Sequence, residues 1–167
     1  WMNMAMIMVQ AGQKDQATHC FQQVVTLIPN HTDALYQLGM LLADAGNMQE
    51  ALNCTQAAVQ SNPGHGPAKA ALGWVLHETG HPDKALPLLR DALTLVPNDF
   101  NTLVLYGNAL RDLKQLPEAA EAYRKAVEVD PNHPEVERNL RRVLQAMIPS
   151  WHQGMLADHG RNDAYQE

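Results

Sequence analysis

The sequence predicts an all-helical fold in which antiparallel helix pairs stack in a row, and two observations carry this prediction. The apolar content, 46% of 167 residues, is mostly Ala, Leu, Val and Met, whereas aromatic residues make up 5%. Ala, Leu and Met enter helices at little cost. Similar phrases, LIPNH, QSNPGH, LVPND and VDPNH, recur every 34 residues and contain Pro29, Pro63, Pro97 and Pro131. A period of this length is typical of a solenoid of stacked helical pairs.

Each repeat is expected to hold a first helix (A) and a second helix (B) that contact through small residues. The four prolines are placed at position 32 of the repeat. Position 8 then carries Ala5, Gly39, Gly73 and Gly107, and position 20 carries Ala17, Ala51, Ala85 and Ala119. Position 27 carries Val24, Ala58, Ala92 and Ala126. Small side chains let the two helices approach closely, and larger apolar residues at positions 4, 11 and 24 fill the space around them. Lys69 at position 4 and Thr55 at position 24 are exceptions.

The turn and capping residues predict where the helices begin and end. Gly46 and Gly80 suit the turn between A and B, and Pro82 and Pro117 suit the first turn of B. Pro87 falls inside a B helix, where we expect a local kink and no break. The A helices are predicted near 1–10, 33–45, 67–79, 101–113 and 135–147, and the B helices near 14–27, 48–60, 82–95 and 116–129.

The two ends of the array differ from its middle. The last helix carries Glu137 and Arg141 where the repeat wants apolar and small residues, which predicts a capping helix with a polar outer face. At the other end, the repeat phase predicts that Met4 and Met8 face the core.

From Trp1 to about residue 147, this pattern resembles the tetratricopeptide-repeat (TPR) family. The resemblance implies a right-handed superhelix of antiparallel helix pairs with about four repeats and a capping helix. The predicted repeats are 1–31, 32–65, 66–99 and 100–133, the capping helix is 134–147, and 148–167 is a C-terminal extension.

In TPR proteins, certain helix-A positions line the concave side of the superhelix. Carried over to this sequence, they predict a partner-binding groove made of Met2, Met6, Tyr36, Met40, Trp74, His77, Val104, Asn108, Arg111, Arg138, Asn139 and Arg142. The first half is rich in Met and aromatic residues, which adapt to varied partners. The second half offers amides and arginines that suit carbonyls and carboxylates. Trp74 is the sharpest candidate for a binding hot spot; the alternative is that it packs against a neighbouring helix.

The predicted function is therefore a protein-interaction scaffold that binds a protein or peptide partner. One TPR subgroup clamps chaperone C-termini with Lys, Asn and Arg, but the matching positions here hold residues such as Tyr36, Met40 and Ala71, so that ligand is not expected. A purely architectural solenoid that self-associates stays open as an alternative, and the oligomeric state is not predicted.

Charge and composition argue against several other classes of function. A net charge of -6 with 12 Lys and Arg residues disfavours nucleic acid and anionic membranes as partners. No apolar run approaches the roughly 18 residues of a membrane span, and no signal-peptide pattern is present, so a cytoplasmic location is expected. No Gly-rich phosphate loop and no pairing of a nucleophile with a base occur, which predicts no enzyme activity and no cofactor in this chain.

The histidine and cysteine positions predict neither a metal site nor a disulfide. His77 and His81 lie four apart with Glu78 between them, which is half a metal site without a third ligand. Cys20 and Cys54 share one position in successive repeats, which places them about 10 Å apart. A disulfide needs Cα atoms within about 7 Å, so free thiols are expected.

After the solenoid, the pattern H-x-x-M-L-x-D-x-x-R-x-x-x-Y runs from His152 to Tyr165. It resembles the helix that leads into the catalytic domain of protein arginine methyltransferases, whose TPR-fused members carry their repeats just before it. The resemblance implies that Arg161 contacts the carboxylate of S-adenosylmethionine and that Met155 borders the substrate pocket. The alternative function is thus the substrate-recruiting region of a longer methyltransferase, whose cofactor loop would lie beyond Glu167. The other interpretation is an amphipathic tail helix.

Overall fold

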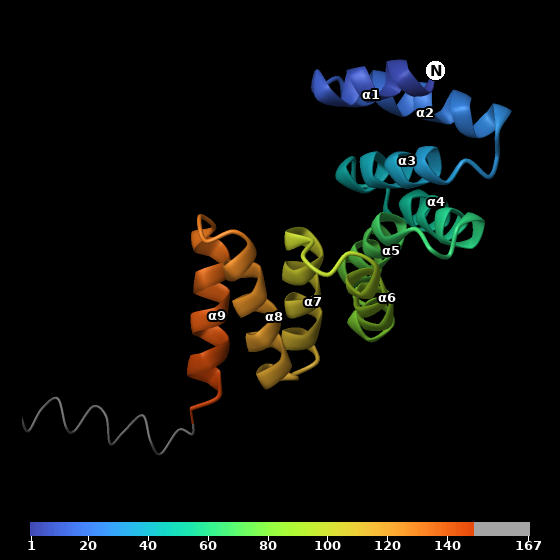
Figure 1. Cartoon of the computed structure of the whole chain (residues 1–167). Helices are drawn as coiled ribbons and strands as arrows, with labels where there is room; N and C mark the ends of the chain where they lie inside the picture. Colours follow the sequence, from blue (N-terminus) through green and yellow to red (C-terminus); the bar gives the residue numbers. More distant parts are fainter. Residues whose placement is uncertain (149–167) are drawn as a thin grey trace, which may run out of the picture.

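The computed structural model describes residues 1–148, and every regular element in that range is an α-helix. The helices are α1 (Met2–Gln10), α2 (Lys14–Leu27), α3 (Thr32–Asp44), α4 (Met48–Ser61), α5 (Gly66–Glu78), α6 (Pro82–Leu95), α7 (Phe100–Asp112), α8 (Leu116–Val129) and α9 (Pro134–Ala146). They form the predicted row of helix pairs (Figure 1). Most predicted boundaries agree with these to within one residue, because the capping and turn residues that mark them are local signals.

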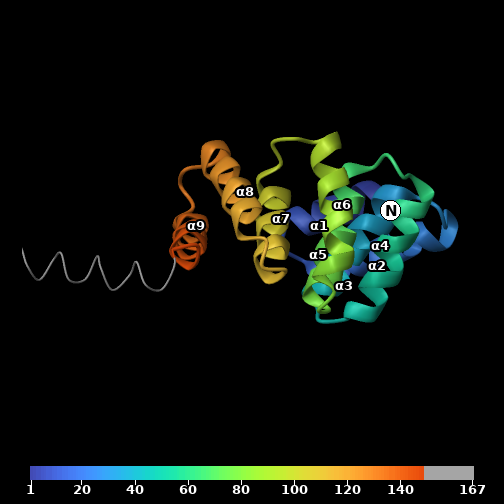
Figure 2. The same ribbon diagram turned by 90° about the horizontal axis from the view of Figure 1, so that it is seen from below.

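The helices stack in chain order into an open solenoid. Each helix packs against its neighbours in the sequence, and α5 also contacts both α3 and α7, which are the A helices of the adjacent repeats. The A helices therefore line a common side, and the solenoid curves so that α1–α4 form one arm and α7–α9 form the other (Figure 1). Seen from below, α9 lies at the far end of the row from α1–α4 (Figure 2).

The A helices of the four pairs end with the same backbone motif. The amide three residues past the helix end bonds to the carbonyl five residues earlier, as in Asn47 N to Leu42 O at 2.8 Å. The residue before that amide adopts a left-handed conformation, and its φ angles are 71°, 84°, 81° and 63° at Gly12, Gly46, Gly80 and Lys114. Glycine adopts this conformation without steric penalty, whereas lysine does not.

The helix crossings explain the small residues of the repeat. A Cβ added at Gly73 would lie 2.7 Å from Leu89 Cγ, and one added at Gly107 would lie 2.8 Å from Tyr123 Cε1. Both facing side chains are fully buried and cannot yield without disturbing the core. The absence of a side chain at these positions is therefore what brings each A helix close to its B helix.

Lys69 and Thr55, the two exceptions in the repeat pattern, are both accommodated in the packing between the helices. Lys69 is only 15% exposed at its side chain, and its Nζ reaches Asp91 Oδ2 at 2.9 Å, so the aliphatic stem replaces the expected apolar residue. Thr55 is fully buried, and its hydroxyl donates to the Ala51 carbonyl at 2.8 Å. A buried hydroxyl bonded in this way leaves no unsatisfied polar group.

The sequence prediction for Met4 is wrong. Its side chain is 48% exposed, whereas Met8 and Met2 are half-buried against the core of the first two repeats. The repeat pattern assumes that a preceding repeat covers α1, but within the described residues α1 packs chiefly against α2. The face that holds Met4 is therefore uncovered.

Two further predictions concern Pro87 and the cysteines. Helix α6 runs unbroken from Pro82 to Leu95 with Pro87 inside it, as predicted, whereas the local kink stays a prediction. Cys20, which is buried, and Cys54, which is half-buried, are both free thiols.

Candidate functional site

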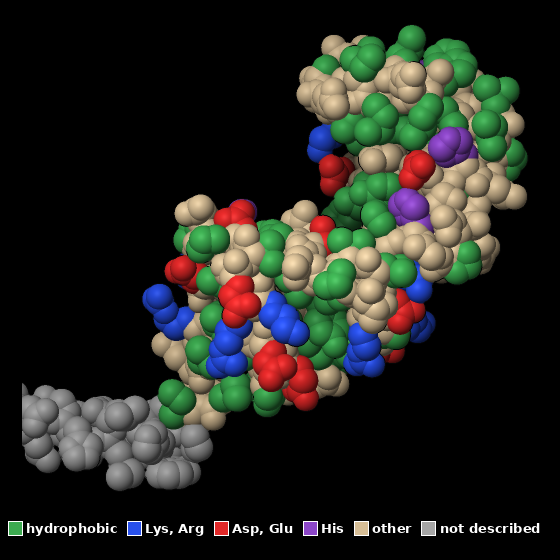
Figure 3. Space-filling view, viewed as in Figure 1, with side chains coloured by type: hydrophobic (Ala, Val, Ile, Leu, Met, Phe, Trp, Pro, Cys, Tyr) green, Lys and Arg blue, Asp and Glu red, His purple; other side chains and the backbone are tan. Residues whose placement is uncertain are grey.

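A groove with a volume of about 600 Å³ lies on the side of the solenoid that the A helices line. Its walls come from α3, α5, α7 and α9, together with the end of α6 and the residues just before α7 and α9. Hydrophobic side chains gather in the hollow between the two arms (Figure 3). A concave, mostly apolar groove of this kind is a candidate ligand site.

The floor of the groove is apolar and made largely of small residues. Ala70 and Ala71 project from α5, and Val104 and Leu105 line the groove from α7. Pro67 lies at the start of α5 and also lines it. Because these side chains are short or compact, they leave space between the helices for an apolar side chain of a partner.

Trp74 lies on α5 and is half-buried. It packs against the core formed by α1–α4 and also lines the groove. Trp74 therefore lies where both sequence interpretations place it: it lines the groove and it packs against neighbouring helices. The packing holds the large ring in place, and a rigid aromatic that lines a groove binds partners at low cost in conformational entropy.

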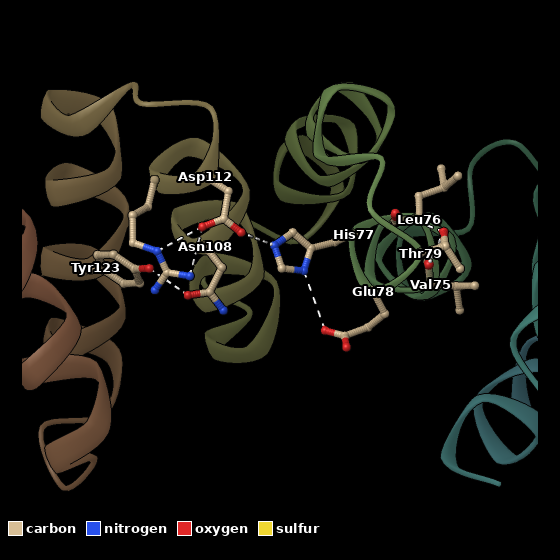
Figure 4. Close-up of polar contacts among 9 residues, drawn as sticks. Val75, Leu76, His77, Glu78, Thr79, Asn108, Asp112 and Tyr123 are labelled. Carbon is tan, nitrogen blue, oxygen red and sulfur yellow. Dashed lines mark hydrogen bonds and ion pairs between the residues drawn. The ribbon is translucent and has the colours of Figure 1, made fainter. Parts of the chain in front are cut away.

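Asn108 brings a hydrogen-bonding amide to the groove. Its Oδ1 accepts a hydrogen bond of 2.6 Å from the Tyr123 hydroxyl on α8 (Figure 4). Burial raises the pKa of Tyr123, so the phenol stays protonated and remains a donor at neutral pH. With its oxygen engaged, Asn108 keeps its two N–H donors for a ligand.

Tyr36 lines the groove from α3 and is half-buried between acidic residues. Burial first, then the charges of Asp99 and Asp33, raise its pKa above the ordinary 10.0. Its ring centroid lies 5.9 Å from that of His65, whose Nε2 is 2.9 Å from Asp33 Oδ1. The phenol is therefore a neutral donor in a negative field.

The groove contains half of the residues that the sequence predicts for it. The predicted residues that line it are Tyr36, Met40, Trp74, Val104, Asn108 and Asn139. The predicted residues that are not part of its lining are Met2, Met6, His77, Arg111, Arg138 and Arg142. Whether either set binds a partner stays a prediction.

The basic residues outside the groove mostly have acidic neighbours of their own. Asp112 accepts from Arg111 Nε at 3.1 Å and lies 2.9 Å from His77 Nε2 (Figure 4). Arg138 Nη2 lies 3.6 Å from Glu135 Oε1, one helical turn earlier. The sequence predicted these side chains to be ligands for a partner, but their helices place carboxylates beside them.

The sequence prediction missed several groove residues near the starts of α7 and α9. Asn101 sits at a groove position of the TPR pattern and could have been carried over. Phe100 and His133 lie just at or before a helix start, outside that pattern, and their rings are 4.3 Å apart between centroids. Only the stacking of α7 on α8 and of α8 on α9 brings these two residues together, so no local signal reveals them.

His77 and His81 lie in different surroundings. His77 contacts Asp112 through Nε2, while its buried Nδ1 makes no hydrogen bond and lies 3.5 Å from Glu78 Oε1. His81 is the exposed residue that precedes α6. Across residues 1–148, no group of three or more His, Cys, Asp or Glu side chains is placed to hold a metal ion.

Two remaining points concern the tail and membranes. Met155 and Arg161, the residues of the methyltransferase resemblance, lie outside the described residues. Among the helices of residues 1–148, none combines the length and the hydropathy that crossing a membrane requires.

Comparisons with known proteins agree with this architecture. The family model described as tetratricopeptide repeat matches residues 1–127. MamA from Desulfovibrio magneticus RS-1 superposes with a TM-score of 0.74 and 27% identity over 84% of this chain and 80% of that chain. YrrB, described as a TPR protein with an unusual peptide-binding site, superposes with a TM-score of 0.72 and 24% identity over 86% of this chain and 74% of that chain. No curated protein matches the sequence.

The family match spans most of the chain, and its helices, turns and small-residue crossings repeat as that family requires. The chain belongs to the tetratricopeptide-repeat family, and its architecture is that of a protein-interaction scaffold.

Proposed function

We propose that this chain binds an extended peptide segment of a partner protein in the groove between α3 and α9. The observation that carries the proposal is the groove itself, which joins an apolar floor to hydrogen-bonding amides on the side lined by A helices. A volume of about 600 Å³ falls within the range of roughly 300–1,000 Å³ typical of ligand sites.

The polar groups support an extended ligand. Asn101, Asn108 and Asn139 line the groove from α7 and α9, and amide side chains can pair with both the N–H and the C=O groups of a peptide main chain. A helical ligand satisfies these main-chain groups internally and would leave the amides without partners. The asparagines therefore favour a ligand whose backbone is open, with its side chains in the apolar floor.

The test begins by selecting ligands from a random peptide library displayed on phage with the full chain as bait. Affinities of the selected peptides are then measured by titration calorimetry for the wild type and for Trp74→Ala. A hot-spot aromatic contributes about 2 kcal/mol or more, so we expect the variant to bind roughly 30-fold more weakly.

Because Trp74 also packs against the core, a second variant is needed. Asn101 is exposed, so Asn101→Ala should leave the fold intact and still weaken binding about fivefold through one lost hydrogen bond. Gln56→Ala, an exposed site on α4 outside the groove, is the matched control. Circular dichroism reports folding for each variant. If both groove variants bind as tightly as the control, the groove is not the binding site.

A second candidate function rests on the tail motif from His152 to Tyr165. We propose it for a longer parent protein, in which the solenoid would recruit substrates to a methyltransferase domain. The parent sequence tests it directly, since a strand that ends in a Gly-rich loop should follow soon after Glu167. A parent without that unit eliminates this candidate.

A further inference from the structure

The Asp, Glu, Lys and Arg side chains that line the groove are all acidic. Among its lining residues the charged side chains are Asp99 and Glu135, and neither Lys nor Arg is present. Asp33 adds a third carboxylate beside Tyr36. In the view of Figure 3, acidic side chains border the hollow, one of them next to a basic side chain of the upper arm, while most of the Lys and Arg side chains lie lower, toward α6–α9. The groove therefore presents an apolar floor with an acidic rim.

The carboxylates near Tyr36 keep unused acceptor oxygens. Asp33 engages His65 through Oδ1, and Asp99 accepts from the Thr102 amide through Oδ2. Within the described residues, no hydrogen bond or ion pair engages the other oxygen of either carboxylate. These two acidic residues come from different repeats, so stacking of the repeats brings their charges to bear on one phenol.

Glu135 is the weaker member of the rim. It is 83% exposed and shares its charge with Arg138, 3.6 Å away on the next turn of α9. The exposed fraction means that solvent screens its field strongly. The acidic character of the groove thus depends mainly on Asp99, just before α7. Asp33 lies outside the groove lining, is 59% exposed and pairs with His65, and it adds its charge to the field at Tyr36.

The apolar floor adjoins this acidic end. Ala70 and Pro67 of α5 line the groove together with Tyr36 and Asp99. A partner residue that enters the floor would therefore place its sequence neighbours within reach of the carboxylates. A carboxylate brought to this end would meet two like charges, whereas a cation would find oxygen acceptors and a phenol, and such complementarity decides specificity more than it decides affinity.

We propose that the groove selects peptide segments in which an apolar side chain stands next to Lys or Arg, with the basic group at Asp33 and Asp99. The apolar side chain occupies the floor beneath Trp74. This inference rests on the proposed function and names the chemistry of its ligand.

The sequences recovered from the random phage library are the first test. Peptides whose binding requires Trp74 and Asn101 should be enriched in Lys or Arg beside a large apolar residue. Synthetic versions of one selected peptide then carry Lys, Gln or Glu at that position. Since one exposed ion pair contributes little, we expect the Lys peptide to bind about two- to fivefold more tightly than the Gln peptide, and the Glu peptide to bind most weakly.

The matched variants locate the effect. Asp99→Asn removes the charge but keeps an acceptor for the Thr102 amide, so α7 stays capped. It should reduce the preference for Lys over Gln, and Asp33→Asn together with Asp99→Asn should abolish it. Glu128→Gln, an exposed change on α8, should leave the preference unchanged. Raising the salt concentration should narrow the difference between the Lys and Glu peptides.

The outcomes separate this inference from the proposed function. Groove-dependent peptides that are neutral or acidic would overturn the basic preference and leave peptide binding standing. A selection that yields no groove-dependent peptide would overturn both. Light scattering that shows a dimer dissociated by Asn101→Ala would assign the groove to a second copy of the chain and overturn the inference as well.

Discussion

The first helix pair, α1–α2, and the fourth, α7–α8, solve the same packing problem with different residues. In the first pair, Ala5 of α1 and Phe21 of α2 are fully buried in the same core cluster, whereas α7 places Gly107 against the ring of Tyr123. In the turn, the first pair has Gly12, while the fourth forces Lys114 into the same left-handed conformation. The repeat therefore conserves the backbone conformation, while the side chains at the crossing and in the turn differ from one pair to the next.

The difference extends to what surrounds each pair. Helix α1 packs chiefly against α2, whereas α7 and α8 are flanked by α6 and α9. The fourth pair also contributes Asn108 to the groove and holds its amide with the Tyr123 hydroxyl. A side chain that serves both the crossing and the groove, as Tyr123 does, makes the fourth pair less tolerant of change than the first.

The largest expected effect is at the crossing of the fourth pair. Gly107→Ala would place a methyl group 2.8 Å from the buried Tyr123 ring, and overpacking of this kind costs about 1–3 kcal/mol. Set against the gain of roughly 1 kcal/mol that alanine brings to an open helix position, the cost leaves a net destabilisation of up to about 2 kcal/mol. Urea denaturation followed by circular dichroism measures the change in the free energy of unfolding.

The reverse change at the first pair sharpens the comparison. Ala5→Gly should also destabilise, by about 1 kcal/mol, because it loses helix propensity at a position where a methyl group already fits. The two opposite substitutions should therefore both lower stability. A stabilised Gly107→Ala protein would mean that Tyr123 can shift freely, and that the crossings do not set residue size.

The second effect concerns the turn of the fourth pair. Lys114→Gly should stabilise the chain by about 1 kcal/mol, because the left-handed conformation is strained for residues with a side chain. Lys114 is exposed and takes part in no ion pair of the described part of the chain, so little is lost with it. Thermal melting checks the gain. Gly80→Ala, at the equivalent turn, should lower the melting temperature, and an unchanged value there would contradict the explanation.

Much of this fold could be predicted from the sequence because its determinants are local and recur. The prolines, the turn glycines and the alanines at the crossings each act within a few residues, so the helix boundaries follow from them. Met4 shows where this reasoning ends: its burial depends on whether another repeat covers α1. The sequence pattern assumes such a neighbour, and none of the described helices provides it.

The groove was less predictable than the fold for a related reason. Tyr36, Met40 and Trp74 follow from the groove positions that the TPR resemblance implies, and they do line the groove. The role of Arg111 depends instead on which charges lie nearby, and adjacent Asp112 engages it. A repeat pattern assigns directions to side chains but does not assign their electrostatic partners.

The smallest expected effect concerns Asp112, whose partners join the third and fourth pairs. Burial by itself would raise its pKa, but hydrogen bonds from His77 and Arg111 outweigh burial and hold the pKa below the ordinary 3.8. A lowered pKa in the folded state means that the ionised carboxylate stabilises the fold above that ordinary value. This contribution is lost as the pH falls through the lower, folded-state pKa.

Asp112→Asn should therefore lower the free energy of unfolding by less than about 1 kcal/mol at pH 6, since the group is partly exposed and screened. The difference between wild type and variant should shrink as the pH is lowered below about 4. Glu121→Gln, an exposed change on α8, controls for the general titration of carboxylates. A difference that stays constant between neutral and acidic pH would show that Asp112 acts through packing and not through its charge.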